Sequence, residues 1–93
     1  MALEFEWDEE KANTNLRKHG IAFEEATTIF SDPFLITIDD PLHSFDEEPF
    51  VNIGYSTKLR VLVVVHTERK NLIRIISARK ATKREREIYE QGV

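Results

Sequence analysis

The apolar positions change period along the chain and divide it into strands and helices. Residues 3–7 alternate apolar and acidic side chains, which predicts a short strand with one buried face. Asp8 is a favourable N-cap for a helix from Glu9 to about Lys18, and Gly20 supplies its left-handed stop. Apolar and small side chains at i, i+3, i+4 and i+7 predict a second helix from about Phe23 to Phe30.

The rest of the chain has mainly the pattern of strands. Phe34–Ile38 is predicted to be a strand, and the polar, acidic stretch Asp39–Pro49, with Pro41 and His43, is predicted to be a loop. Turns are expected at Ser56–Leu59 and Glu68–Asn71. They separate three further strands, Phe50–Tyr55, Arg60–Thr67 and Leu72–Ala78.

A capping-box pattern begins the last element. Thr82 and Glu85 have the required spacing, so a final helix is expected from there to about Gln91. Val61–Val65 is apolar on both faces and should be a central strand covered by helices on at least one side. The order β-α-α-β-β-β-β-α, with short turns between strands, predicts one α+β domain over residues 1–93 with a mostly antiparallel sheet.

Charge is distributed unevenly along the 93 residues. Residues 1–50 carry 3 basic and 13 acidic side chains, a net charge of −10, whereas residues 51–93 carry 10 basic and 4 acidic ones, a net charge of +6. This gathering of cations predicts a local site for a polyanion, and it also suits a charge-matched protein partner. The chain has no cysteine, no apolar run long enough to cross a bilayer and no signal peptide, which together favour the cytoplasm.

The basic residues at the start of the last helix have two interpretations. Lys83 and Arg84 occupy its first turn, the unfavourable end for cations, yet free backbone N–H groups and cations there can together bind phosphate. Lys80 lies just before this turn. Alternatively, the basic residues form a solvated face held by salt bridges, such as an i, i+4 pair between Arg86 and Glu90. The sequence leaves both interpretations open.

Two arginines are the sharper candidates for chemistry. Arg79 ends an apolar strand at the rim of the sheet, and Arg86 lies one helical turn before Tyr89. Such a pair could stabilise a phosphorane-like transition state while the tyrosine positions a nucleophile, without a metal. Tyr89 can equally be a core contact whose hydroxyl reaches the surface.

The position of His66 depends on strand register. If Arg69-Lys70 forms the hairpin loop, His66 shares a face with Ser77 and Arg79 and is a candidate catalytic residue. A one-residue slip moves it beside Arg74, and a satisfied, partly buried histidine is the alternative. Arg74 itself needs an acidic partner, expected on a covering helix.

The first helix offers further polar residues. Lys11, Asn15 and Lys18 recur on one helical face, and His19 follows them. They are either solvent-facing residues or a second wall of a cationic cleft. The three histidines lack the spacing of a zinc site, no phosphate loop is present, and adjacent Asp39 and Asp40 point opposite ways, so no metal or cofactor is expected.

Three segments together resemble the BrnT toxin family: FEWDEEKANTNLRKHGIAFEEA, VVVHTER and IRIISARKATKREREIYE. The resemblance covers nearly the whole chain. One departure is Ala22, where family members commonly carry a capping Ser. The loss of that cap costs about 1 kcal/mol locally. The matching positions are Trp7-Asp8, Lys11, Asn15, Lys18-His19-Gly20, Phe23-Glu24-Glu25-Ala26, His66-Thr67-Glu68-Arg69, Ser77-Ala78-Arg79, Glu85-Arg86 and Tyr89.

The resemblance implies a RelE-like fold and a ribonuclease toxin of a bacterial type II toxin–antitoxin pair. Cleavage would need no metal, would leave a 2′,3′-cyclic phosphate and would arrest growth. The implied partner is a BrnA antitoxin with a ribbon-helix-helix domain that binds promoter DNA. The toxin itself would contact this DNA only through the antitoxin. Two rival interpretations remain, a nucleic-acid-binding module without catalysis and a protein-interaction domain. The implied site combines catalytic Arg79, Arg86, His66 and Tyr89 with RNA-binding Lys18, His19, Lys80, Lys83 and Arg84.

Overall fold

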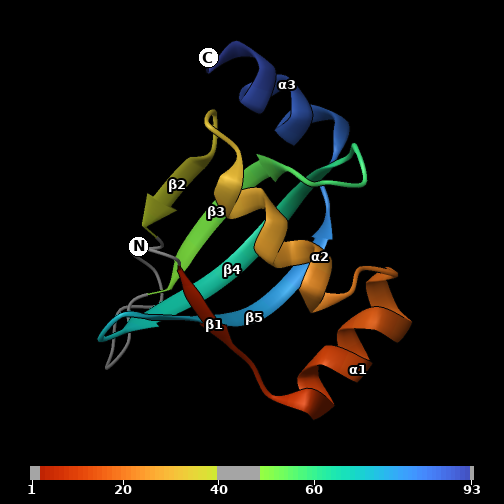
Figure 1. Ribbon diagram of the computed structural model, residues 1–93. Coiled ribbons are helices and arrows are strands. Elements are labelled where there is room, and N and C mark those ends of the chain that lie inside the picture. Colours follow the sequence, from red (N-terminus) through yellow and green to blue (C-terminus); the bar gives the residue numbers. More distant parts are fainter. Residues whose placement is uncertain (1–2, 40–48, 93) are drawn as a thin grey trace.

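The computed structural model describes residues 3–39 and 49–92 and confirms the predicted α+β fold (Figure 1). Elements follow in the predicted order, with a short 3-10 turn added after the second helix. Most of the predicted acidic loop, with Pro41, His43 and the candidate pair member Asp40, lies outside the described residues.

The described strands form one five-stranded sheet in the order β1-β5-β4-β3-β2. β1 runs parallel to β5, and the other neighbours are antiparallel. The last hairpin is tighter than predicted, because β4 extends to Arg69 and only Lys70, with a positive φ of 58°, and Asn71 connect it to β5. The strands are β1 (Glu4–Glu6), β2 (Ile36–Asp39), β3 (Phe50–Tyr55), β4 (Val61–Arg69) and β5 (Leu72–Lys80).

Local capping explains where the first helix begins and ends. Asp8 accepts hydrogen bonds from the backbone N–H groups of Glu10 and Lys11 to start α1 (Glu9–His19), and Gly20, with φ 72°, stops it. α2 (Phe23–Thr28) is shorter than predicted and continues as the 3-10 turn η1 (Ile29–Ser31). Ala22 gives α2 no side-chain cap, and the hydroxyls of two threonines, Thr27 and Thr28, bond back to the carbonyls of Glu24 and Glu25.

The sheet buries apolar side chains on both faces, as the apolar run in β4 predicted. On one face α2 crosses the central strands, with Phe23 and Ile29 of the α2–η1 segment in the same buried cluster as Leu62, Val64 and Ile75 (Figure 1). On the other face, α3 (Lys83–Gln91) places Tyr89 against a smaller cluster. The buried members of that cluster are Ile53, Val61 and Val63.

A bulge between β4 and β5 decides which side chains share a face. Val65 pairs with Ser77, but the next residue, His66, pairs with Ile75. Because paired residues point to the same side of a sheet, Ser77 and Arg79 lie on the α3 face, whereas His66 lies on the α2 face. The predicted sharing of a face by His66, Ser77 and Arg79 is therefore wrong. A simple hairpin register could not reveal the extra residue in β5.

Candidate functional site

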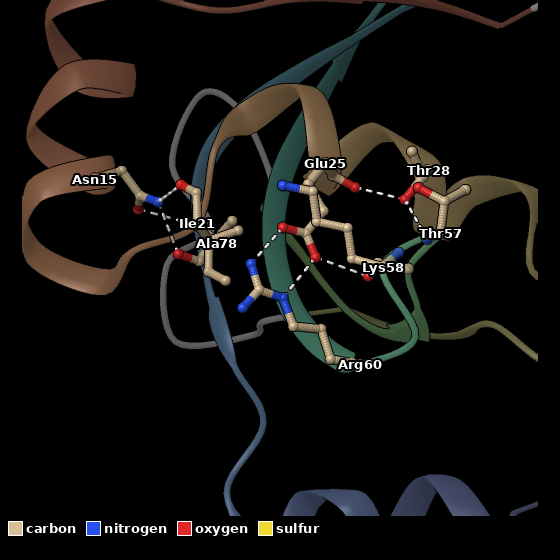
Figure 2. Close-up of polar contacts among 9 residues, drawn as sticks. Asn15, Ile21, Glu25, Thr28, Thr57, Lys58, Arg60 and Ala78 are labelled. Atoms are coloured by element: carbon tan, nitrogen blue, oxygen red, sulfur yellow. Dashed lines mark hydrogen bonds and ion pairs between the residues drawn. The ribbon is translucent and has the colours of Figure 1, made fainter.

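The C-terminal half of β5 lies between α1 and α3. β1 pairs with β5 only as far as Arg74, which leaves the outer edge of β5 open beyond that residue. The buried Asn15 of α1 closes this edge by bonding both backbone groups of Ala78, at 2.8 and 3.0 Å (Figure 2). Its amide also donates to the carbonyl of Ile21 at 2.9 Å. Asn15 thus acts as a substitute strand and fixes α1 against β5.

A hollow of about 360 Å³ opens where α1 meets β5. The exposed Lys11 and Lys18 and the half-buried His19 are among its lining residues. The basic side chains of α1 line the same hollow as Ile76 and Ser77 of β5, and their role as a second wall of a binding cleft stays a prediction. The remaining lining residues are Glu10, Thr14, Asn15, Ile76 and Ser77.

Arg79 continues this surface along β5 and is held by Glu85 of α3. Its two terminal nitrogens donate to the two carboxylate oxygens of Glu85 at 2.7 and 2.8 Å, and Nη1 also lies 3.3 Å from the carbonyl of Lys80. The Arg79 side chain is 41% exposed and that of Glu85 25%. Hydrogen bonds from Arg79 outweigh burial and hold the Glu85 pKa at about 2, while the same bonds raise the pKa of Arg79.

The start of α3 carries basic side chains that are exposed to solvent. The predicted capping box is confirmed, since Thr82 and Glu85 bond to each other's backbone N–H groups. The predicted i, i+4 ion pair between Arg86 and Glu90 is not formed among the described residues, whereas Glu85 of the same helix pairs with Arg79. Four exposed side chains make no ion pair within the described residues: Lys80, Lys83, Arg84 and Arg86.

His66 lies on the opposite side of the sheet from Arg79. It is 1% exposed, its ring stacks on Phe50 and it meets the edge of Phe30. Asn52 contacts Nδ1 at 2.6 Å, and Glu68 contacts Nε2 at 3.0 Å. Because the Asn52 nitrogen is a donor, Nδ1 accepts and Nε2 carries the proton toward Glu68. These are the contacts of a satisfied core histidine.

Tyr89 is likewise engaged within the fold. Its hydroxyl donates to Asp32 at 2.5 Å, and burial together with this bond raises its pKa to about 12. Burial opposes ionisation of Asp32, but bonds from Tyr89 and from the backbone N–H groups of Phe34 and Tyr55 outweigh it and lower the Asp32 pKa. A proton held this firmly is poorly suited to transfer near neutral pH.

Other polar pairs stabilise the fold in places that the sequence pattern left undetermined. Arg74 contacts Glu6 at 3.5 Å, so its partner comes from the neighbouring strand β1 and not from a covering helix. Buried Glu25 binds Arg60 through two bonds of 2.6 and 2.8 Å (Figure 2). It also accepts a hydrogen bond from the Ser56 hydroxyl. This network fixes the β3–β4 turn to α2. Such pairs join positions far apart in sequence and leave no local signal.

No three His, Asp or Glu side chains of the described residues are grouped as a metal ion would require. None of the helices among them is long and apolar enough to cross a membrane. The described surface around β5 carries cations and His19 together with two carboxylates, those of Glu10 and Glu85.

These features define a small α+β domain with basic side chains on both sides of its fifth strand. Residues 7–85 match the family described as "Ribonuclease toxin, BrnT, of type II toxin-antitoxin system". Since the match spans most of the chain, the protein belongs to the BrnT family of ribonuclease toxins, and this membership implies an RNA target and an antitoxin partner.

A solved structure shares the fold. The Brucella abortus ribonuclease toxin BrnT aligns with a TM-score of 0.65 and 24% identity, over 88% of this chain and 100% of that chain. No sequence among curated proteins matches the chain. The α+β fold predicted from the order of elements and from the family resemblance is therefore confirmed.

Proposed function

We propose that this toxin is an endoribonuclease that cuts RNA without a metal ion and thereby arrests growth. The observation that carries the proposal is the position of Arg79. It lies on β5 between the basic hollow of α1 and the open cations at the start of α3. A single RNA strand lying across this half of β5 would meet positive charge from both helices.

The cations supply the electrostatic part of the chemistry. Positive groups aimed at a phosphate stabilise the charge that develops as the phosphorus becomes five-coordinate, a role that a bound metal fills in other nucleases. Lys11 and Lys18 would bind phosphates on the α1 side, and Lys83 and Arg86 on the α3 side. Lys80 and Arg84 extend the same surface.

His19 is our candidate for proton transfer, since it lines the hollow and histidine can exchange a proton near neutral pH. It would take the proton of the ribose 2′-hydroxyl as the 2′-oxygen attacks phosphorus. The bond from phosphorus to the 5′-oxygen then breaks, and that oxygen takes a proton from water. The products are a 2′,3′-cyclic phosphate and a 5′-hydroxyl. We assign His66 and Tyr89 to the fold, because their polar atoms already have partners.

The direct test is incubation of the purified free protein with RNA in EDTA, followed by analysis of the new ends. We expect cleavage with 2′,3′-cyclic phosphate termini, and His19→Gln should slow it by about 10²-fold or more. Strict dependence on an added divalent ion would contradict metal-free cleavage. RNA binding that weakens steeply with salt, without any cleavage, would instead support the non-catalytic alternative.

The antitoxin partner belongs to the same proposal. We propose a BrnA-type protein whose ribbon-helix-helix domain binds the promoter, so that the toxin reaches DNA only through it. We propose that this pair acts in the cytoplasm, where the toxin would meet its RNA target. The basic surface around β5 offers charge complementarity to an acidic antitoxin segment, which would exclude RNA by covering it.

A further inference from the structure

Arg79 uses only part of its hydrogen-bonding capacity within the described fold. A guanidinium group has five N–H donors. Nη1 uses its two on Glu85 and the Lys80 carbonyl, and Nη2 uses one on Glu85. Nε–H and the second Nη2–H have no partner among the described residues. Two donors of a half-exposed arginine are therefore open.

These two open donors lie on one edge of the planar group. Glu85 occupies the edge between Nη1 and Nη2. The edge formed by Nε and Nη2 presents two nearly parallel N–H bonds, the geometry that matches two oxygens of a phosphate. Ser77, two residues earlier on the same face of β5, lines the α1 hollow, so the open edge lies beside the proposed RNA surface.

Glu85 can hold this edge in place because it is itself held. Its Oε1 accepts from the backbone N–H of Thr82 at 2.8 Å as well as from Arg79, and its own N–H donates to the Thr82 hydroxyl. The capping box thus fixes the carboxylate at the start of α3, and the carboxylate fixes the plane of the guanidinium. A ligand that meets an already oriented arginine loses less entropy on binding.

We infer that the Nε–Nη2 edge of Arg79 binds the two non-bridging oxygens of the RNA phosphodiester, with Glu85 as the residue that positions it. The inference rests on the proposed ribonuclease function and adds to it the contact with the phosphate. This arrangement explains why the Glu85 carboxylate is present in a surface that binds a polyanion. Glu85 pairs with the Nη1–Nη2 edge of Arg79, and the phosphate binds the other edge.

The test uses Glu85→Gln in the full chain. Glutamine is tolerated at this capping-box position, so the helix start is retained, but its one oxygen is also the acceptor for the Thr82 N–H, and its NH2 group is a donor that cannot bond the second Arg79 nitrogen. We expect kcat for RNA cleavage to fall by roughly 10- to 100-fold with little change in KM, because the arginine charge remains while its orientation is lost. Arg79→Lys, which keeps the charge but has no fork, should fall similarly.

The matched control is Glu87→Gln, which makes the same charge change at an exposed residue of the same helix. We expect its cleavage rate to stay within about twofold of the wild type. Thr82→Ala removes the hydroxyl that accepts from the Glu85 N–H but keeps the backbone N–H that bonds the Glu85 carboxylate, so the Arg79–Glu85 pair should remain. We expect a lower unfolding midpoint and little change in the cleavage rate. Glu85→Gln protein that unfolds like the wild type and keeps its full rate would overturn the inference.

A second readout separates this inference from the proposed function. Inorganic phosphate is titrated into labelled protein while the Arg79 Nε–H signal is followed by NMR. We expect this signal to shift in the wild type and in Glu87→Gln, and to respond less in Glu85→Gln. An unshifted wild-type signal would overturn the phosphate contact even if RNA is cleaved. Wild-type protein that cleaves no RNA would refute the proposed function. The titration would still show whether the Nε–Nη2 edge of Arg79 binds phosphate.

Discussion

The two arginines of the proposed site differ in how they are held. Arg79 is fixed by two bonds to Glu85, whereas Arg86 is exposed and has no ion pair within the described chain. Arg79 is therefore suited to a defined contact with the scissile phosphate. Arg86 can move to meet the RNA backbone, as a flexible cation on the first turns of α3.

Replacing either arginine should abolish growth arrest while leaving the fold intact. Loss of one charged donor to a transition state costs about 10²- to 10³-fold in rate, so we expect Arg79→Ala and Arg86→Ala to lose most RNA cleavage. Growth curves and single-turnover cleavage check this, with circular dichroism as the control for folding. If both variants are soluble, folded and fully toxic, the site lies elsewhere.

Tyr89 should behave as a structural residue. Tyr89→Phe removes the 2.5 Å bond to Asp32, and we expect the free energy of unfolding to fall by about 1–2 kcal/mol at neutral pH. RNA cleavage should remain, because a hydroxyl with a pKa of about 12 keeps its proton. Chemical denaturation and a cleavage assay on the same sample measure both effects. A stable but inactive variant would return Tyr89 to the catalytic set.

Single side chains show where prediction from sequence ends. The caps at Asp8, Gly20 and Thr82 were predictable because each acts within its own helix turn. The partners of Asn15 and Arg79 were not, since Asn15 reaches Ala78, 63 positions away, and Glu85 could be assigned to its helix cap without reference to Arg79. Of the proposed site, the sequence could therefore supply the basic residues but not their orientation.

At the level of elements, a single residue of α1, and not a broad apolar face, fixes the position of this helix. Asn15 is the one buried residue of this helix. Its side chain bonds the N–H and the carbonyl of Ala78 on the open edge of β5 and the carbonyl of Ile21, just after the helix ends. The helix is therefore positioned by hydrogen bonds at the edge where β1 ends. The same bonds set the distance between the basic residues of α1 and Arg79.

Asn15→Ala should weaken both the fold and the site. It leaves buried backbone groups of Ala78 and Ile21 without partners, and we expect a loss of about 2–4 kcal/mol in the free energy of unfolding. RNA cleavage should also fall, as Lys11 and Lys18 move with α1. Asn13→Ala, at an exposed position of the same helix, is the matched control. Equal unfolding curves for the two variants would show that these bonds contribute little.

The elements themselves were largely predictable, and the bulge was not. Alternation, caps and turn residues gave every described strand and α-helix, with ends displaced by two residues at most. The extra residue in β5 leaves no mark in an apolar run such as Ile75-Ile76, yet it moves His66 to the opposite face from Arg79. A shift of one position in a strand was enough to divide the predicted catalytic set.

At the scale of the whole molecule, opposite charges divide along the sequence. Residues 1–50 carry a net charge of −10 and, apart from the basic residues of α1, should repel RNA, so the substrate should approach the basic surface around β5. An antitoxin can inhibit by covering this surface or by binding elsewhere and blocking contact with a larger target. Charge complementarity favours direct cover.

Direct cover makes a structural prediction. In a complex of toxin and antitoxin, the side chains of Arg79 and Arg86 should lose their solvent exposure, and acidic groups of the antitoxin should lie beside them. A crystal structure of the complex measures this directly, and hydrogen exchange at the start of α3 gives an independent check. If both arginines stay open to solvent, inhibition works by blocked docking.

The central claim is that RNA crosses β5 between α1 and α3, and neighbouring residues of α1 test it most directly. Lys18 lines the hollow, whereas the exposed Arg17 does not. The measurement is the single-turnover rate of RNA cleavage in EDTA for Lys18→Ala and Arg17→Ala. We predict a loss of roughly tenfold or more for Lys18→Ala and a change within about twofold for Arg17→Ala. Equal rates for the two variants would contradict this path for the RNA.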